Sequence, residues 1–401
     1  MNWMLTDMDA YFASVEQYLR PELRSRPVGV IPVETDSTCV IAASYDAKRL
    51  GVKVGTGVRE ARRLCPGIAL VKARPKIYVQ IHQGILQSVD KCAEVDRVYS
   101  IDEWTIQLQG DNRRLDQASG LAQDIKRKIL EDFGPWMTCS IGIAPTRLLA
   151  KIASNLQKPN GLTVLPVCDM PDCIEHLSLK DLCGVSNGML ARFNKHGVRS
   201  IRELWELSQD QAVRIWGSVS GARWWAGFHG HDEQEMPTRR RSMSHGNVLE
   251  PRFRNDEGAR CIMVRLVCKL AQRLRRRGYL ATSLRISVKD VQGGCFSQEI
   301  DLPSAHDTPT LLRQFYTLWQ RRRPNLCPIK KVNVTVAGLV LASQVSRPLF
   351  AEIEKLQRVS ETIDKINERC GALAIYFGPV HDYRQLMENK IAFGRIPDEF
   401  D

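Results

Sequence analysis

The sequence has no long hydrophobic run. No apolar stretch approaches the roughly 20 residues that a helix needs to cross a bilayer, and the N-terminus lacks the basic and then apolar pattern of a signal peptide. We therefore expect no membrane partner and a cytoplasmic location.

The sequence also lacks the cysteine spacing of structural zinc sites. Its twelve cysteines include no Cys-x-x-Cys pair. Several, such as Cys139 and Cys268, lie in apolar segments, where a free cysteine behaves as a small hydrophobic residue. His229 and His231 have no further histidine or cysteine nearby, which favours a polar linker over a metal site. Repeats and low-complexity segments are absent as well.

The length and the charge of the chain set its broad class. With 401 residues and 43% hydrophobic content, we expect more than one domain. The net charge of +12 favours a polyanionic partner, either nucleic acid or an anionic surface. Residues 237–341 hold 16 arginines and four lysines against seven acidic residues, so this segment carries essentially all of the excess positive charge.

Two carboxylate pairs stand about a hundred residues apart. Asp7 and Asp9 follow the apolar run Trp3-Met4-Leu5, and Asp102-Glu103 lies between two further apolar runs. Neighbouring residues on a straight strand point to opposite faces, so Asp102 and Glu103 can share one site only at a hairpin tip. Carboxylates that converge from two strands can hold a pair of Mg²⁺ ions, which prefer oxygen ligands. A surface acidic pair is the alternative for Asp102-Glu103.

The first 167 residues are predicted to form a mixed sheet with helices on one side, interrupted by a small subdomain. Besides the strand at the N-terminus, the expected strands are 27–31, 39–43, 137–144 and 162–165. The expected helices are 44–51, 58–64, 76–92, 115–133 and 147–157. Residues 168–228 read as short helices, with the glycine loop between Gly184 and Gly188 lying between two helices, a pattern that aims backbone N–H groups at a phosphate.

The basic segment, which follows a polar linker, has a different order of predicted helices and strands. Its hydrophobic pattern predicts strand 243–249, helix 257–277, strands 280–288 and 295–300, helix 310–321 and strand 332–340. The order β-α-β-β-α-β indicates a ferredoxin-like sandwich with one sheet face free. Arginine triplets at 239–241, 275–277 and 321–323 favour contact with a nucleic-acid backbone over solvated helix ends.

Four motifs in this order resemble the Y-family, or translesion, DNA polymerases, the group that contains DinB and UmuC. They are Asp-Met-Asp-Ala-Tyr-Phe at 7–12, Tyr-x-Ala-Lys at 45–48, Ser-Ile-Asp-Glu at 100–103 and Lys-Pro-Asn-Gly at 158–161. The resemblance covers roughly residues 1–345. It implies an α+β right-hand polymerase with the following parts: palm 1–33 and 70–167, fingers 34–69, thumb 168–230 with a helix-hairpin-helix-like loop, linker 231–238, little finger 239–342 and tail 343–401.

The resemblance also implies roles for individual residues. Asp7, Asp102 and Glu103 would be catalytic and, with the Met8 carbonyl, would bind two Mg²⁺ ions. Phe12 would be the steric gate against ribonucleotides, and Tyr45, Lys48 and Lys158 would hold the incoming deoxynucleoside triphosphate. Asp9 would support the site from outside the ligand set. Primer-template DNA would contact Arg239, Arg240, Arg241, Arg275, Arg276, Arg277, Gly184 and Gly188.

Some positions depart from the family pattern. Lys48 stands where arginine is frequent, which replaces a bidentate grip by a point charge. Trp104 follows the acidic pair where a small residue is usual, and it could crowd the metal site or fill the core. Ser186 replaces a glycine of the thumb loop.

The tail resembles the UmuC branch at 371–378. Residues 344–350 resemble a sliding-clamp peptide, in which Gln344, Leu349 and Phe350 would be the anchors; a plain linker is the alternative.

The expected function is template-directed, low-fidelity DNA synthesis past damage. A catalytically silent scaffold that recruits another polymerase is one rival, which the retained carboxylates oppose. A nucleotide cyclase is another, which the basic segment and Lys-Pro-Asn-Gly oppose. Whether an accessory subunit must dock before activity appears stays open.

Overall fold

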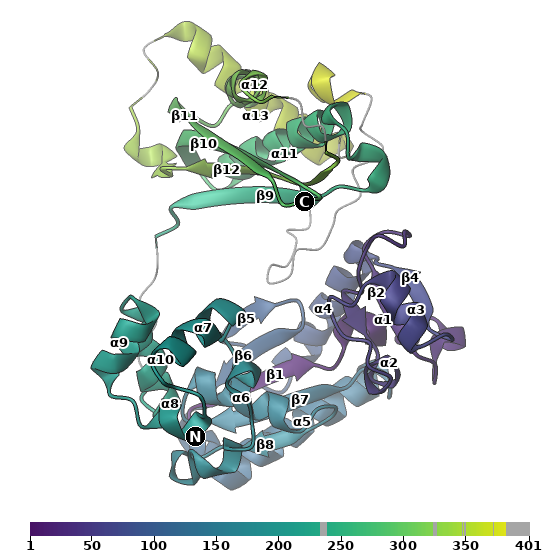
Figure 1. The fold of residues 1–401 in the computed structure, drawn as a ribbon, viewed down its shortest axis with the longest axis vertical. Coiled ribbons are helices and arrows are strands. Elements are labelled where there is room, and N and C mark those ends of the chain that lie inside the picture. Colours follow the sequence, from purple (N-terminus) through teal and green to yellow (C-terminus); the bar gives the residue numbers. More distant parts are fainter. Residues whose placement is uncertain (233–238, 324–326, 347, 349, 372, 382–401) are drawn as a thin grey trace. The chain divides into compact units, whose positions relative to one another are not determined.

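The computed structural model describes residues 1–232, 239–323, 327–346, 348, 350–371 and 373–381. The chain divides into two compact units, Met1–Glu235 and Met236–Asn389 (Figure 1). No helix in these described ranges combines the length and the apolar character needed to cross a membrane.

A five-stranded sheet with the order β5-β6-β1-β7-β8 forms the centre of the first unit. The strands are β1 (Trp3–Met8), β5 (Arg97–Ser100), β6 (Glu103–Gln107), β7 (Cys139–Ala144) and β8 (Leu162–Val164). All neighbours are antiparallel except β7 and β8. The N-terminal strand β1 is therefore central, and its residues are buried along its whole length.

Helices cover both faces of this sheet, so the prediction of helices on one side is wrong. Met4 and Met8 of β1 pack in a core with α1 (Tyr11–Leu19), α4 (Pro75–Asp90) and α5 (Leu115–Phe133). Trp3 and Leu5, which alternate with them, pack instead with α6 (Arg147–Leu156). Side chains alternate between the two faces of a strand, so Asp7 shares the α6 face with Trp3 and Leu5.

A small subdomain interrupts this arrangement. Its three-stranded sheet, in the order β3-β2-β4, consists of β2 (Val28–Ile31), β3 (Ala42–Ala43) and β4 (Ala69–Lys72). The helices α2 (Tyr45–Arg49) and α3 (Val58–Leu64) complete it. The Ser44 hydroxyl caps α2 by accepting a hydrogen bond from the Ala47 amide, which fixes where the helix with Tyr45 and Lys48 begins.

The rest of the first unit is helical, as predicted. It contains α7 (Asn187–Lys195), α8 (Ile201–Trp205), α9 (Gln209–Trp216) and α10 (Ser220–Phe228). One detail of the prediction is wrong, because a short 3-10 helix, Leu179–Asp181, and not an α-helix precedes the glycine loop. Ser186 caps α7 through the Met189 amide, which is a structural use for this departure from the family pattern.

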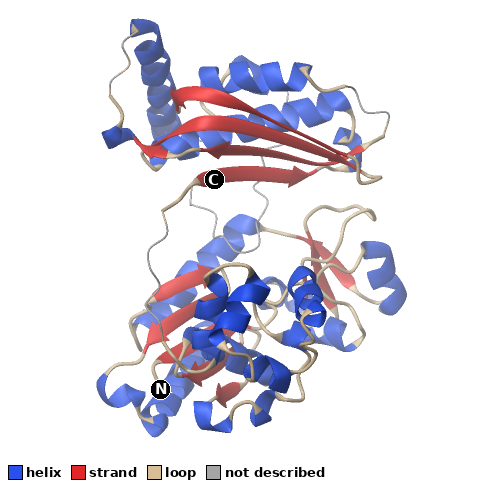
Figure 2. Cartoon of the chain, turned by 60° about the vertical axis from the view of Figure 1, so that its left-hand side comes forward, coloured by secondary structure: helices blue, strands red, loops and turns tan. Residues whose placement is uncertain are grey.

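The second unit confirms the predicted β-α-β-β-α-β order. Its elements are β9 (Ser242–Val248), α11 (Asp256–Arg276), β10 (Tyr279–Asp290), β11 (Cys295–Ala305), α12 (Thr308–Gln320) and β12 (Ile329–Ala337), followed by a short β13 (Val340–Leu341) beside β10. The sheet order is β11-β10-β12-β9, with all neighbours antiparallel. Both helices lie on one face of this sheet (Figure 2).

A long helix follows the sandwich. The predicted tail helix is α13 (Ala351–Cys370), which packs against α11 and α12. Arg275 of α11 and Asp364 of α13 join the two helices with a bidentate ion pair, in which Nε donates over 2.6 Å and Nη2 over 3.0 Å. The tail helix is therefore bound to the helix layer of the second unit.

Candidate active site

Sheet register brings the predicted carboxylates together. Asp7 at the end of β1 lies directly opposite Glu103 at the start of β6. The chain turns at residues 101 and 102 between β5 and β6, which confirms the predicted hairpin tip. The Met8 amide donates to the Asp102 carbonyl over 2.8 Å. The turn is thus tied to the strand that carries Asp7.

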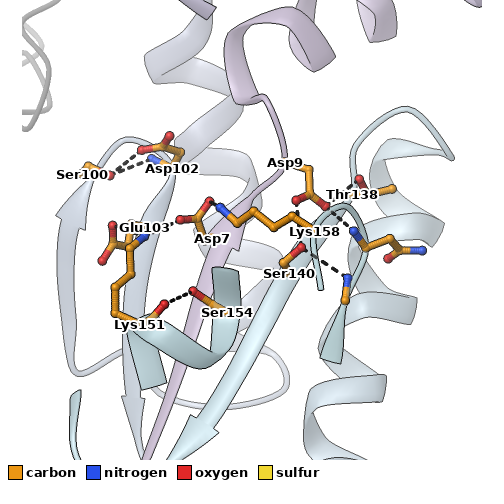
Figure 3. A network of polar contacts seen from close by, with 12 residues as sticks. Asp7, Asp9, Ser100, Asp102, Glu103, Thr138, Ser140, Lys151, Ser154 and Lys158 are labelled. Atoms are coloured by element: carbon orange, nitrogen blue, oxygen red, sulfur yellow. Dashed lines mark hydrogen bonds and ion pairs between the residues drawn. The ribbon is translucent and has the colours of Figure 1, made fainter. Parts of the chain in front are cut away.

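Two lysines contact these carboxylates (Figure 3). Lys151 of α6 donates from Nζ to Asp7 Oδ2 and to Glu103 Oε2, the latter over 2.8 Å. Lys158, just past the end of α6, donates to the other oxygen of Asp7. Burial alone would lower the pKa of Lys151, but the charges of Asp7 and Glu103 outweigh burial and raise this pKa. Lys151 is therefore held in its charged form.

Asp102 has a different environment. Its carboxylate accepts a hydrogen bond from the Ser100 hydroxyl across the turn (Figure 3). Burial raises the pKa of Asp102; the hydrogen bond from Ser100 and the charge of Lys151 lower it, while the charge of Asp7 raises it further. Ser100 thus helps to keep a half-buried carboxylate ionised.

Asp9 connects three segments that converge behind the site. Its buried carboxylate accepts hydrogen bonds from Thr138 Oγ1 (3.0 Å), Ser140 Oγ (2.8 Å) and the Asn160 amide (2.7 Å). The Tyr45 hydroxyl donates to it over 3.5 Å. This placement fits the supporting role expected for Asp9, because its lone pairs are committed to the protein.

The three residues predicted to hold the triphosphate lie near one another. The ammonium of Lys48 sits 4.1 Å from the centre of the Tyr45 ring. Burial and the neighbouring charge of Lys158 lower the pKa of Lys48. Burial raises the pKa of Tyr45, followed by the charge of Asp9. Lys48 and the neutral Tyr45 of α2 thus lie near Lys158, on the side of the site where Tyr45 contacts Asp9.

Phe12 is held rigidly in the first turn of α1. Its ring stacks on Tyr78 of α4 with centroids 4.6 Å apart and is only 7% exposed. Tyr78 is in turn fixed by its hydroxyl, which donates to Glu16 over 2.7 Å. A ring held in this way can act as a fixed wall, as a steric gate requires.

Trp104 fills the core. It is fully buried and packs with Met4 and Ile141 in the core on the α4 and α5 side. Glu103, one residue earlier on the strand, points to the opposite face, towards Lys151. The tryptophan therefore does not crowd the carboxylates.

The donor chemistry of the site fits a hard divalent cation. Asp7 and Glu103 offer oxygens from adjacent strands and Asp102 lies at the turn beside them, which is the ligand type that Mg²⁺ prefers. Among the residues that the structure describes, however, no three acidic, histidine or cysteine side chains stand close enough to form a finished metal site. The side chains would have to leave their lysine and serine partners to share an ion.

The arginine triplets differ in their availability. Arg275 is a correction to the expected DNA contacts, since its guanidinium is buried and bound to Asp364, to the His306 carbonyl (2.7 Å) and to Thr308 Oγ1 (3.2 Å). Arg276 and Arg277 are exposed, although Arg276 lies 3.8 Å from Glu368. The side chains of Arg239 and Arg241 are exposed and Arg240 is half-buried.

The remaining predicted residues lie at the surface or outside the described ranges. Gly184 has a φ of +85°, a conformation that favours glycine, and Gly188 lies in the first turn of α7. Gln344 accepts a hydrogen bond from Arg239 over 3.4 Å. Phe350 is 66% exposed at the start of α13. Leu349 lies outside the described residues.

Lys151 is the principal residue that sequence reasoning missed. The available signal was a lone lysine in the otherwise apolar run from Leu148 to Ala153. Such a residue would point to solvent unless a carboxylate faces the helix. Thr138 and Ser140, which donate to Asp9, were also missed, because short polar residues in or beside a strand carry no specific signal. The Lys-Pro-Asn-Gly motif did not reveal that the Asn160 backbone amide donates to Asp9.

The chain is similar to known proteins over most of its length. Residues 6–155 match the impB/mucB/samB family, and residues 240–349 match the C-terminal domain of the same family. The DNA polymerase IV of Moorella thermoacetica is 32% identical over 93% of this chain and 94% of the relative. The DNA polymerase IV 2 of Mesorhizobium japonicum is 28% identical over 98% and 96%.

Solved structures show the same fold. A Y-family DNA polymerase chimera of Dbh and Dpo4 has a TM-score of 0.70 at 21% identity, covering 85% of this chain and all of that one. An insertion ternary complex of Dbh DNA polymerase has a TM-score of 0.55 at 22% identity, with the same coverage. The expected likeness of the tail to the UmuC branch stays a prediction. The relatives reported above are named DNA polymerase IV and say nothing about that branch. The chain belongs to the impB/mucB/samB family, whose members are the Y-family DNA polymerases.

Proposed function

We propose that the chain is a template-directed DNA polymerase of the translesion class that adds deoxynucleotides to a primer 3′-hydroxyl. The observation that carries the proposal is the cross-strand pair of Asp7 and Glu103, with Asp102 at the adjoining turn, inside a family whose curated relatives are named DNA polymerase IV. The retained carboxylates speak against the silent scaffold, and nothing in the comparisons favours it.

The carboxylates would bind the metal and Lys158 the substrate. Asp7, Asp102, Glu103 and the Met8 carbonyl would hold two Mg²⁺ ions. When bound, such ions stabilise negative charge that develops on the transferred phosphoryl group and align the attacking hydroxyl. Lys158 follows the end of α6, so its side chain can exchange Asp7 for a phosphate oxygen without moving the helix.

The nucleotide would lie between the palm and α2. Lys48 and Tyr45 start from α2 and face Asp9 and Lys158, so they can contact the β- and γ-phosphates. Phe12 would exclude the ribose 2′-hydroxyl, because its stacking on Tyr78 leaves it little freedom to withdraw.

DNA would be held mainly through its phosphates. We assign this role to Arg239, Arg240, Arg241, Arg276 and Arg277, and to the loop from Gly184 to Gly188, and we drop Arg275. Backbone contacts of this kind give steep salt dependence and little sequence preference. We retain the palm, fingers, thumb, linker and little-finger boundaries given above as part of this proposal.

The segment before α13 is proposed as a clamp-binding peptide. The exposure of Phe350 suits an aromatic anchor for an apolar pocket. A cytoplasmic location and an optional accessory subunit belong to the same proposal.

Primer extension tests the proposed function. The purified chain is incubated with Mg²⁺ and primed templates that differ only in the next template base. Each of the four deoxynucleoside triphosphates is supplied separately with each of the four templates. We expect incorporation of the complementary nucleotide, abolished by EDTA. Absence of extension, with wild type and Asp102→Ala giving the same trace, would remove the polymerase assignment.

A further inference from the structure

Lys151 stands between two carboxylates of the site. Its ammonium contacts Asp7 and Glu103 at once, and its side chain is only 20% exposed. It comes from the middle of α6, flanked by the buried residues Ala150 and Ile152. Its backbone is therefore fixed by the core on that face of the sheet.

This position answers an electrostatic problem. Residues directly opposite on antiparallel strands have Cβ atoms about 4.5–5.5 Å apart, so Asp7 and Glu103 would place two negative charges side by side. Their side chains are 11% and 22% exposed, so water screens them poorly. Removal of the positive charge of Lys151 would leave the two carboxylates uncompensated and would destabilise the fold.

Lys151 and Lys158 differ in what holds them. Lys158 follows the end of α6 and forms an ion pair with Asp7, whereas Lys151 bridges Asp7 and Glu103 from within the helix. The described residues also contain no finished group of three metal-binding side chains. The ammonium of Lys151 thus lies where a cation shared by the two strands would lie.

We propose that Lys151 is a positioning residue that acts as a built-in counter-cation. It keeps Asp7 and Glu103 in place when no divalent cation is bound, and a divalent cation must displace it from them. This inference rests on the proposed function, since it concerns the same carboxylates. Its consequence is that divalent cations bind weakly to the protein alone, because they must first displace the ammonium of Lys151.

The test uses the full chain without DNA or nucleotide. Mn²⁺ binding to wild type, Lys151→Met and Lys151→Arg is measured by electron paramagnetic resonance, and thermal melting is recorded in EDTA and across the same titration. We expect Lys151→Met to bind Mn²⁺ about tenfold more tightly, because a competing charge is gone. It should melt below wild type in EDTA and recover as Mn²⁺ is added, while Lys151→Arg should resemble wild type in both.

A matched control is Lys128, which bridges Asp132 (2.8 Å) and Glu131 (3.7 Å) on the surface of α5. Lys128→Met should change neither Mn²⁺ affinity nor the Mn²⁺ dependence of melting. Unchanged or weaker Mn²⁺ binding by Lys151→Met would overturn the inference, as would a loss of stability that Mn²⁺ does not restore.

Primer extension by the wild type separates the two proposals. If the wild type extends primers while Lys151→Met binds Mn²⁺ no more tightly, only the inference about Lys151 fails. If the wild type does not extend primers, the proposed function fails, whatever Lys151 does.

Discussion

The two units each contain a buried cluster of opposite charges, and the clusters differ in kind. In the second unit, Arg275 makes a bidentate pair with Asp364 and donates from Nη1 to the His306 carbonyl and to Thr308. In the first unit, Lys151 and Lys158 approach Asp7 and Glu103 with single ammonium groups. A planar guanidinium that binds a carboxylate through two nitrogens fixes one geometry, whereas an ammonium is a point charge that another cation can replace.

The comparison suggests that one cluster stabilises the fold and the other takes part in catalysis. The Arg275 cluster joins α13 to α11 through the ion pair of Arg275 and Asp364. Asp7, Glu103 and Lys151 of the Lys151 cluster lie within residues 6–155, which match the family model. Curated relatives of the chain are named DNA polymerase IV. We therefore expect changes in the Lys151 cluster to alter catalysis and changes in the Arg275 cluster to alter stability.

The largest expected effect is on catalysis. Asp102→Asn should lower the rate of nucleotide incorporation by about 10³-fold or more, since metal stabilisation of the transition state amounts to several kcal/mol. Quenched-flow incorporation measures the rate, and circular dichroism checks the fold. A variant that keeps more than a tenth of the wild-type rate would show that Asp102 is not a metal ligand.

The next effect is on stability. Asp364→Ala leaves the guanidinium of Arg275 buried without its carboxylate, so it should destabilise the second unit by about 3–5 kcal/mol. Urea unfolding measures the loss. Glu354→Ala is the control, because it removes a surface i,i+4 pair with Arg358 on the same helix and should cost less than about 1 kcal/mol. Equal losses for both variants would contradict the structural role of Asp364.

A buried histidine beside the turn at residues 101 and 102 should make stability depend on pH. Burial lowers the pKa of His82 to about 4, despite its hydrogen bond to the Ile101 backbone. The unfolded chain, with a pKa near 6.5, then takes up the proton first, so stability falls as the pH drops from about 6.5 to 4, by at most about 3 kcal/mol. His82→Gln should flatten urea-derived stability across this window. An unaltered pH profile in the variant would exclude His82 as the cause.

The smallest effect concerns sugar selection. Phe12→Ala should raise ribonucleotide incorporation relative to deoxyribonucleotide incorporation by about 10- to 200-fold, the range for removing steric exclusion in a pocket. Competing incorporation of the two nucleotide types on one template gives this ratio. Tyr18→Ala is the control, because Tyr18 lies on the same helix but packs edge-on against Phe133. An unchanged ratio in Phe12→Ala would remove Phe12 from the gate role.

Local pattern was enough to predict most elements. Helices α3 and α5 begin and end at the predicted residues, and the alternation of Leu284, Ile286 and Val288 correctly predicted a strand with one buried face. The hairpin tip at Asp102 followed from the requirement that both carboxylates reach one site. These features depend on neighbours in sequence, which a periodic pattern records.

Features that depend on distant partners were missed. Lys151 finds Asp7 only because α6 covers the sheet face opposite α5, and no pattern within α6 reveals which face it covers. Arg275 looked like part of a basic surface because its partner, Asp364, lies 89 residues further along the chain. Composition gives the total charge of a segment, whereas only packing decides which charges remain available to a ligand.

The measurement that tests the account most directly is single-turnover incorporation of one correct nucleotide at saturating primer-template DNA. Wild type, Asp102→Asn and Asp364→Asn are compared in Mg²⁺, with the DNA dissociation constant of each obtained from fluorescence anisotropy. The account predicts that Asp102→Asn binds DNA like wild type but incorporates almost nothing, whereas Asp364→Asn incorporates at the wild-type rate once folded and bound. Incorporation by Asp102→Asn at the wild-type rate, or no templated incorporation by the wild type, would contradict it.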